Sequence, residues 1–168
     1  TYVIAHRKMK PTASNDMTYP SAPIKLSPWE GTVGIEMSPK GVVSILTREG
    51  ASWGWGAGFE IQAKKGENLS KYKSGHLHLT IRGNSKVSFQ IGYQSGRWSD
   101  NNQVNNFVSF GPNTSRKLGS RWIDYKIPMS ELHNGGNLSD VGSVLSILST
   151  TRDADKKIYI KNIYYTQD

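Results

Sequence analysis

The chemistry that this sequence offers lies in its five tryptophans and in several side-chain amides. Residues 53–59 read Trp-Gly-Trp-Gly-Ala-Gly-Phe, so aromatic rings alternate with residues that have almost no side chain. In an extended strand, Trp53 and Trp55 would share one face, about 6 to 7 Å apart, which is close to the step between sugar rings in an extended polysaccharide. This spacing predicts a platform for stacking on flat sugar rings. The alternative is that both indoles belong to the core, as large aromatic residues on strands often do.

Amide side chains gather on a second predicted strand, which is followed by a polar loop. Gln90 and Gln94 share a face of residues 87–94, and amides both donate to and accept from sugar hydroxyls. The loop at residues 95–102 carries one aromatic residue, which either folds back or meets a flat ligand. The candidate carbohydrate-binding residues are therefore Trp53, Trp55, Gln90, Gln94, Arg97, Trp98 and Asn102.

The elements that must position these residues are strands, because two-residue alternation recurs along the chain and helical periodicity is nearly absent. We expect strands at residues 33–37, 42–47, 53–62, 76–82, 87–94, 106–110, 122–127, 144–149 and 158–165. Turn signals separate them at the short spacing of a sandwich or barrel. The prediction is an all-β fold, a β-sandwich jelly roll of two antiparallel sheets. Residues 1–30 are expected to form an irregular N-terminal segment on the sandwich, with an opening strand at residues 2–6.

Bulk properties narrow the possible functions. A length of 168 residues fits one domain, here taken as residues 1–168. The net charge of +8 raises nucleic acid or an anionic polysaccharide as a partner, but the basic residues form scattered doublets and no nucleic-acid-binding motif is present. No run approaches the roughly 18 to 20 apolar residues of a membrane span, so we expect a soluble chain without a membrane or nucleic-acid partner. The absence of cysteine excludes disulfides and thiol catalysis, and leaves the compartment open.

Three phrases resemble jelly-roll carbohydrate-binding modules of the galactose-binding-like superfamily. Residues 68–77 resemble the entry into a central strand of those modules. Residues 122–132 are similar to their phrase of an aromatic residue, isoleucine-proline and serine-acid-leucine. Residues 158–165 look like their closing strand, where Asp-Asn is commoner than the Lys161-Asn162 found here. The similarity runs from about residue 33 to the end, and the nearest likenesses are to the family 29, 11 and 4 types.

This resemblance implies a noncatalytic module that binds a β-linked glucan or a related cell-wall glycan in a groove. Residues 55–57 are similar to an aromatic-Gly-Ala strand start in family 29, which favours Trp55 over Trp53 as a groove residue. Gln90 falls on a strand whose outward side chains bind sugar in that family. Many such sandwiches also hold a structural calcium with a carboxylate from the closing strand. Lys161 stands at that position here, so no cofactor is expected to be required and a structural calcium is left open.

The implied context is a monomeric module of a larger, secreted polysaccharide-degrading enzyme. One alternative is binding of a sulfated or uronate polysaccharide through Lys and Arg. Another is a polysaccharide lyase or glycoside hydrolase domain, and a third is a protein-interaction sandwich. A lyase would draw on residue types present at His76, His78, Arg82, Gln90 and Tyr93, and a hydrolase on a carboxylate pair, for which Glu36 and Glu60 are the strand candidates.

Overall fold

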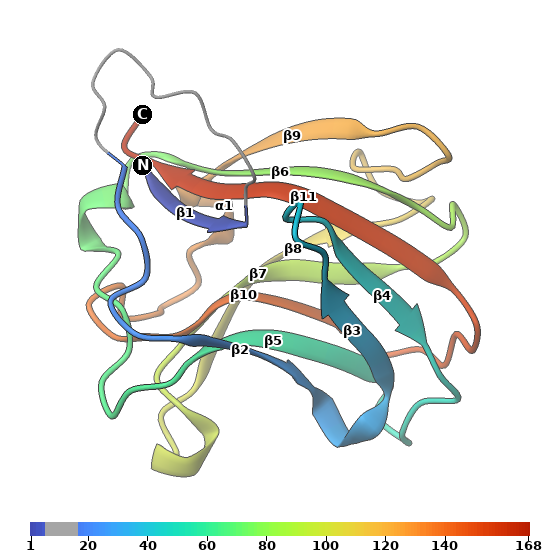
Figure 1. Cartoon of the computed structure of the whole chain (residues 1–168), viewed down its shortest axis with the longest axis horizontal. Coiled ribbons are helices and arrows are strands. Elements are labelled where there is room, and N and C mark those ends of the chain that lie inside the picture. Colours follow the sequence, from blue (N-terminus) through green and yellow to red (C-terminus); the bar gives the residue numbers. More distant parts are fainter. Residues whose placement is uncertain (6–16) are drawn as a thin grey trace.

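The computed structural model describes residues 1–5 and 17–168 and shows two antiparallel sheets packed face to face (Figure 1). Sheet A has the order β3-β4-β11-β6-β9, with β1 also paired to β11, and sheet B has the order β2-β5-β10-β7-β8. The strands are β1 (Tyr2–Ala5), β2 (Ile24–Pro28), β3 (Val33–Met37), β4 (Val43–Thr47), β5 (Trp55–Ile61), β6 (His76–Gly83), β7 (Phe89–Ser95), β8 (Val104–Phe110), β9 (Ile123–Pro128), β10 (Val141–Ser149) and β11 (Lys157–Thr166). The all-β sandwich predicted from the alternation is confirmed.

The core lies between the sheets and is filled by alternate residues of each strand. On β6, Leu77 and Ile81 are fully buried, and on β5 the same holds for Trp55. Because the period of a strand is two, the intervening residues must point to the outer faces of the sandwich. The sandwich therefore presents two outer faces, one on sheet A and one on sheet B.

Several short elements were not expected from the sequence. Strand β2 lies within the segment predicted to be irregular and forms the edge of sheet B. Pro28, which has no backbone N–H to donate, is tolerated because it ends an edge strand. Helix α1 (Met129–Leu132) follows β9 directly. The opening strand is confirmed as β1, whereas His6 of the predicted range lies outside the described residues. In the described part of the chain, no helix has the length and apolar character needed to cross a membrane.

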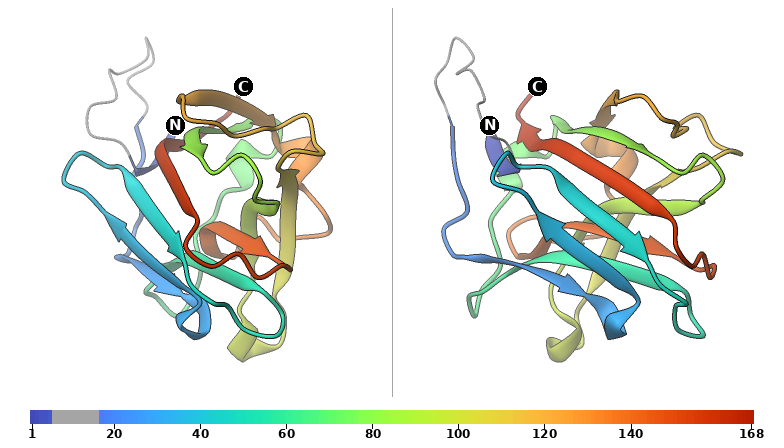
Figure 2. Two further views of the ribbon diagram at one scale, coloured as in Figure 1. Left: turned by 90° about the vertical axis from the view of Figure 1, so that its right-hand side faces the viewer. Right: turned by 45° about the vertical axis from the view of Figure 1, so that its right-hand side comes forward.

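Two 3-10 turns project from sheet B on the side away from the core. Turn η1 (Trp29–Gly31) follows β2, and η3 (Trp98–Asp100) joins β7 to β8. Both lie below sheet B in Figure 1 and remain below it in the two rotated views of Figure 2. Each turn carries a tryptophan, so both ends of this face bear an indole. A third turn, η2 (Ser70–Tyr72), precedes β6.

Candidate functional site

The outer face of sheet B is lined by very small side chains. On β5 the outward positions are Gly56 and Gly58, and their register partner on β10 at position 58 is Ser146. Ser146 is in turn paired with Gly92 on β7. This row of glycine and serine across three strands presents no large side chain of its own, and its residues are buried beneath neighbouring groups. The aromatic residues that would bind there must therefore come from elsewhere in the chain.

Trp29 occupies the space that these glycines leave. A Cβ atom at Gly56 would lie 2.5 Å from Cε3 of Trp29, and one at Gly58 would lie 3.3 Å from its Cζ2. The indole therefore lies across both glycines, against their backbone. Its Nε1 donates to Oε1 of Glu60 at 3.4 Å, which fixes the orientation of the ring. Trp29 is half-buried, so part of the indole remains open to a ligand.

Trp53 stands beside Trp29 and not in line with β5. The two ring centroids lie 6.4 Å apart with an interplanar angle of 50°. The Trp53 indole Nε1 also donates to a carboxylate oxygen of Glu30. Gly54 breaks the strand alternation, since its φ is +128° and a Cβ there would lie 1.9 Å from the Ser149 carbonyl oxygen. Trp53 and Trp29 thus form an aromatic pair at one end of the face.

The structure corrects the prediction for Trp55. Its side chain is 0 % exposed and packs against Phe89, with ring centroids 6.1 Å apart. Its Nε1 donates to Oδ2 of Asp153 at 2.9 Å, so the polar atom of the indole is also satisfied. A ring enclosed in this way cannot stack on a sugar. The predicted role of Trp55 as a ligand platform, and the preference for Trp55 over Trp53 as a groove residue, are therefore wrong.

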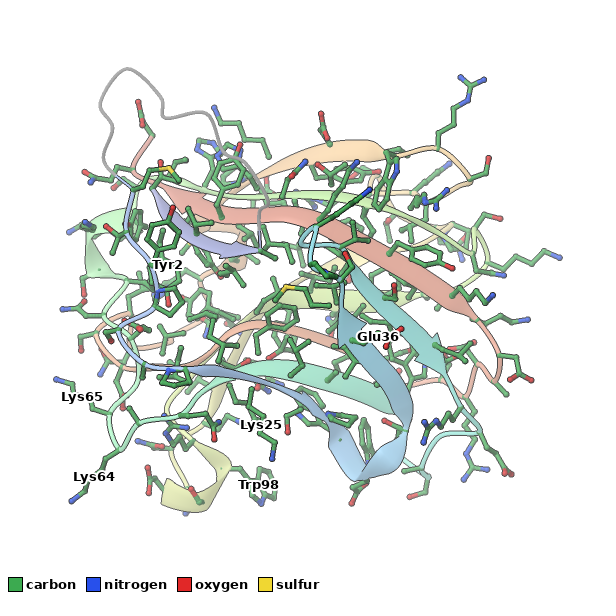
Figure 3. All side chains as sticks on the ribbon, in the orientation of Figure 1. Tyr2, Lys25, Glu36, Lys64, Lys65 and Trp98 are labelled. Carbon is green, nitrogen blue, oxygen red and sulfur yellow. The ribbon has the colours of Figure 1, made fainter. Side chains whose placement is uncertain are left out.

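Trp98 lies near the other end of the face and is 85 % exposed. Figure 3 shows its side chain on the side of sheet B that faces away from the core. Arg97 anchors the loop, because its Nη2 donates to the carbonyl oxygens of Ile61 at 2.9 Å and Ala63 at 2.7 Å. The side chain of Asn102 accepts from the Arg97 backbone N–H at 2.8 Å. Arg97 and Asn102 therefore hold the turn that presents Trp98, and their predicted contact with a ligand stays a prediction.

The two glutamines differ in what they offer. Gln90 is exposed, whereas Gln94 is 5 % exposed and both ends of its amide are bonded within the protein. Its Nε2 donates to Oδ1 of Asn105 at 2.9 Å, and its Oε1 accepts from Ser146 at 3.1 Å. Gln94 thus positions the exposed amide of Asn105, which leaves Gln90 and Asn105 as the amides that face solvent here.

Sequence reasoning missed three residues of this face. Trp29 was missed because it follows a five-residue edge strand that ends in proline and lies in a segment predicted to be irregular. Asn105 and Phe107 lie at the start of β8, before or at the edge of the predicted strand. The Phe107 ring covers Gly92, where a Cβ would lie 2.7 Å from Cδ1 of Phe107. The signal that could have found Trp29 and Phe107 is glycine itself, because outward glycines on a central strand leave room for a ring from elsewhere.

The residue set of a lyase is not brought together. His76, His78 and Arg82 point from β6 to the outer face of sheet A, whereas Gln90 lies on the opposite face of the sandwich. Tyr93 is fully buried between the sheets. The hydrolase candidates are likewise separated, because Glu36 belongs to sheet A and Glu60 to sheet B. The candidate residues of the lyase and of the hydrolase are therefore not gathered at one site.

A family model described as carbohydrate binding domain 30 matches residues 5–167. The chain belongs to this family. A search among curated proteins found no match. The module's fold is shared by solved structures of carbohydrate-binding modules at low sequence identity.

One such structure is the family 30 module of a cellulosomal cellulase of Clostridium thermocellum, with a TM-score of 0.66 and 16 % identity over 89 % of this chain and 95 % of that one. Another is a family 11 module from Clostridium thermocellum in complex with a β-1,3-1,4-mixed-linked tetrasaccharide, with a TM-score of 0.57 and 13 % identity over 84 % and 87 % of the two chains. A third is a variant family 29 module complexed with mannohexaose, with a TM-score of 0.57 and 10 % identity over 99 % and 90 %.

Membership of family 30 makes the chain a noncatalytic carbohydrate-binding module. A structural calcium on its closing strand stays a prediction that the residues do not favour. Lys161 stands where a carboxylate is expected, and its Nζ lies 4.2 Å from the ring centroid of Trp122. In residues 1–5 and 17–168, no three His, Cys, Asp or Glu side chains gather in a way that could hold a metal ion.

Proposed function

We propose that this family 30 module binds a β-linked glucan on the outer face of sheet B, by stacking sugar rings on Trp29, Trp53 and Trp98. The observation that carries the proposal is the seat of Trp29 on Gly56 and Gly58, because it fixes a half-buried indole on the outer side of β5, where the strand itself has no side chain. Gln90 and Asn105 are exposed on the same face and supply amides for hydroxyl groups.

The two ends of the face are separated by a length that suits several sugar rings. Trp29 lies over positions 56 and 58 of β5, whereas the Trp98 turn is anchored at Ile61 and Ala63. At about 3.3 Å per residue along a strand, these points lie roughly 15 Å apart. A glycan chain that follows β5 would therefore reach the indole pair with one end and Trp98 with the other.

The solved relatives support the ligand class. The family 11 structure contains a β-1,3-1,4-linked tetrasaccharide, and the similar family 30 module belongs to a cellulosomal cellulase. These relatives favour a glucan as the ligand. They also favour the role of a monomeric accessory module in a secreted enzyme, which the module would keep close to its polysaccharide substrate.

The expected affinity is modest. By analogy with base stacking, each ring contact contributes on the order of 1 to 3 kcal/mol before the ordering costs of binding are subtracted. Two or three such contacts correspond to dissociation constants from about micromolar to millimolar. The indole N–H groups of Trp29 and Trp53 already have carboxylate partners, so little ordering of these rings remains to be done on binding.

The test is affinity electrophoresis in gels that contain mixed-linkage β-glucan. We expect Trp29→Ala and Trp98→Ala each to abolish most of the retardation, while Trp122→Ala, on the opposite sheet, retains it. Near-ultraviolet circular dichroism checks that each variant is folded. Full retardation of the folded Trp29→Ala and Trp98→Ala proteins would overturn the proposal.

A further inference from the structure

The outer face of sheet A carries a ladder of cations and aromatic rings. The Arg82 guanidinium carbon lies 4.9 Å from the ring centroid of Trp122 and 5.0 Å from that of Tyr159, so two rings flank it. Lys161 adds a second cation, with its Nζ 4.2 Å from the Trp122 centroid. These residues come from β6, β11 and the residue before β9, and we call Arg82, Trp122, Tyr159 and Lys161 the cation ladder.

The cations of this face have no carboxylate partner. Among residues 1–5 and 17–168 the single ion pair joins Arg116 and Glu131, so neither Arg82 nor Lys161 is neutralised by direct contact. The Nε of Arg82 is buried and has no hydrogen-bond partner. Buried donors are normally satisfied, so Arg82 carries a hydrogen-bonding group that the described part of the chain leaves unused, as do four other side chains with a buried polar atom.

A hollow beside the ladder supplies space for an anion. It has a volume of about 440 Å³ and is lined by Arg82, Tyr159 and Lys157, together with the polar side chains of Asn84 and Ser120 and the single carboxylate of Asp155. Two cations thus face one hollow in which hydroxyl and amide groups are also present. This combination matches a sugar that carries a negative charge.

We propose that the cation ladder and its hollow bind a carboxylate-bearing polysaccharide, that is, a chain of uronic acid residues. The planar fork of arginine pairs with a carboxylate through two parallel hydrogen bonds, and the flanking rings hold Arg82 in place before the ligand arrives. The faces of Trp122 that meet Arg82 and Lys161 are already occupied by cations. The ladder therefore binds charge and leaves stacking on neutral sugars to the opposite face.

The pattern of charge favours a polyuronate over a nucleic acid. Glu36 and Asp124 lie on the same outer face as the ladder, and a densely phosphorylated backbone would be repelled by both. A polyuronate carries one carboxylate per sugar and many hydroxyl groups, so it can place its charges at Arg82 and Lys161 and its hydroxyls near the carboxylates. Because this face is distinct from the glucan face, the two ligands would bind independently.

The experiment is isothermal titration calorimetry of the whole module with hexagalacturonate and with cellohexaose at low and high salt. The first variant is Arg82→Lys, which keeps the charge and loses the fork. The second is Lys157→Gln with Lys161→Gln, which leaves Arg82 intact. The matched control is Lys64→Gln with Lys65→Gln, which removes two charges from the exposed loop after β5 that Figure 3 shows away from sheet A.

We expect both ladder variants to weaken hexagalacturonate binding by on the order of tenfold, and the loop control to change it by less than about twofold. Binding should fall as salt rises and persist when cellohexaose is saturating. Equal losses of hexagalacturonate affinity in the ladder and loop variants would show that the ligand responds only to the net charge of the module, and would overturn the proposal. Displacement by cellohexaose, or no binding by the wild-type module at low salt, would overturn it as well. If the module bound hexagalacturonate but not cellohexaose, the result would contradict the proposed glucan function and leave the polyuronate proposal standing.

Discussion

The indole of Trp29 rests on the backbone of Gly56, at a distance that leaves no room for a methyl group between them. This contact joins the turn after the edge strand of sheet B to the next strand inward, because Trp29 follows β2 and Gly56 lies on β5. It also explains why β5 has glycine at its outward positions 56 and 58, since a larger side chain there would collide with the Trp29 ring. The ring and the missing side chains together form the surface on which a glucan is proposed to stack.

Replacement of Gly56 tests that contact. In Gly56→Ala the new Cβ would lie 2.5 Å from the Trp29 ring and 2.9 Å from the Ile147 carbonyl oxygen, so the indole must move and the ladder between β5 and β10 is strained. We expect a loss of roughly 1 to 3 kcal/mol in the free energy of unfolding and a clear loss of glucan affinity. Gly119→Ala is the matched control, since a Cβ there would have no heavy atom within 4 Å. Calorimetric binding and urea unfolding of both variants measure the difference, and equal effects at the two positions would contradict the seating of Trp29 on Gly56.

Trp55 should behave as a core residue. Trp55→Phe removes the hydrogen bond to Asp153 and leaves part of the indole volume empty, so we expect the free energy of unfolding to fall by about 2 to 4 kcal/mol. Glucan affinity of the folded protein should stay within about twofold of wild type. Urea unfolding and calorimetry measure the two quantities separately. A stable Trp55→Phe protein that no longer binds glucan would show that the ring reaches the ligand after all.

The contrast between Trp55 and Trp29 shows which features of the site the sequence can predict and which it cannot. Alternation predicted nearly every strand, because burial enforces a period of two, and it allowed the core position that the structure shows for Trp55. It could not place Trp53, since the positive φ of Gly54 takes that residue out of the strand. It also could not place Trp29, because a turn over a neighbouring strand is a tertiary relationship between residues 27 positions apart.

For the polar side chains of the site, the sequence likewise predicts which way they point but not which hydrogen bonds they make. The sequence identified Gln90 and Gln94 as outward residues, and parity was right for both. Only the folded structure shows that both ends of the Gln94 amide are hydrogen-bonded, to Asn105 and to Ser146. Hydrogen bonds between strands that are distant in sequence decide which amides remain for a ligand, and no local pattern encodes them.

Arg97 is expected to act through Trp98. Arg97→Ala removes the hydrogen bonds to the Ile61 and Ala63 carbonyl oxygens, so the turn that carries Trp98 loses its anchor on β5. We expect glucan affinity to fall by about three- to tenfold because a mobile indole must be ordered on binding. Arg121→Ala, at an exposed position next to Trp122, is the charge-matched control. Fluorescence anisotropy of Trp98 reports the mobility, in a protein where Trp29, Trp53 and Trp122 are replaced by phenylalanine and the buried Trp55 contributes the same background to both proteins. Unchanged affinity in Arg97→Ala would contradict the anchoring role.

His78 makes stability depend on pH. Burial, together with the neighbouring charges of Lys126 and His76, lowers the pKa of His78 from 6.5 to about 4. The unfolded chain therefore takes up a proton at this residue at a higher pH than the folded chain does. Stability should decline as pH falls from about 6.5 to about 4 and gain nothing from this residue's titration above that window.

The variant His78→Gln isolates this effect, because glutamine can keep the hydrogen bond that the His78 Nε2 shares with Thr166 at 2.8 Å. Urea unfolding of both proteins between pH 4 and 7 measures the slope of stability against pH. We expect the wild-type slope to exceed that of the variant. Parallel curves would show that residue 78 titrates alike in the folded and unfolded chains.

The five tryptophan indole N–H groups offer the most direct test of the glucan face, since each gives its own signal in a nitrogen–proton correlation spectrum. Titration with cellohexaose is expected to shift the signals of Trp29, Trp53 and Trp98, which lie on or beside the outer face of sheet B. The buried Trp55 and the opposite-face Trp122 are expected to stay in place. A spectrum in which Trp122 shifts while Trp29 and Trp98 do not would place the glucan on sheet A and contradict the proposed binding face.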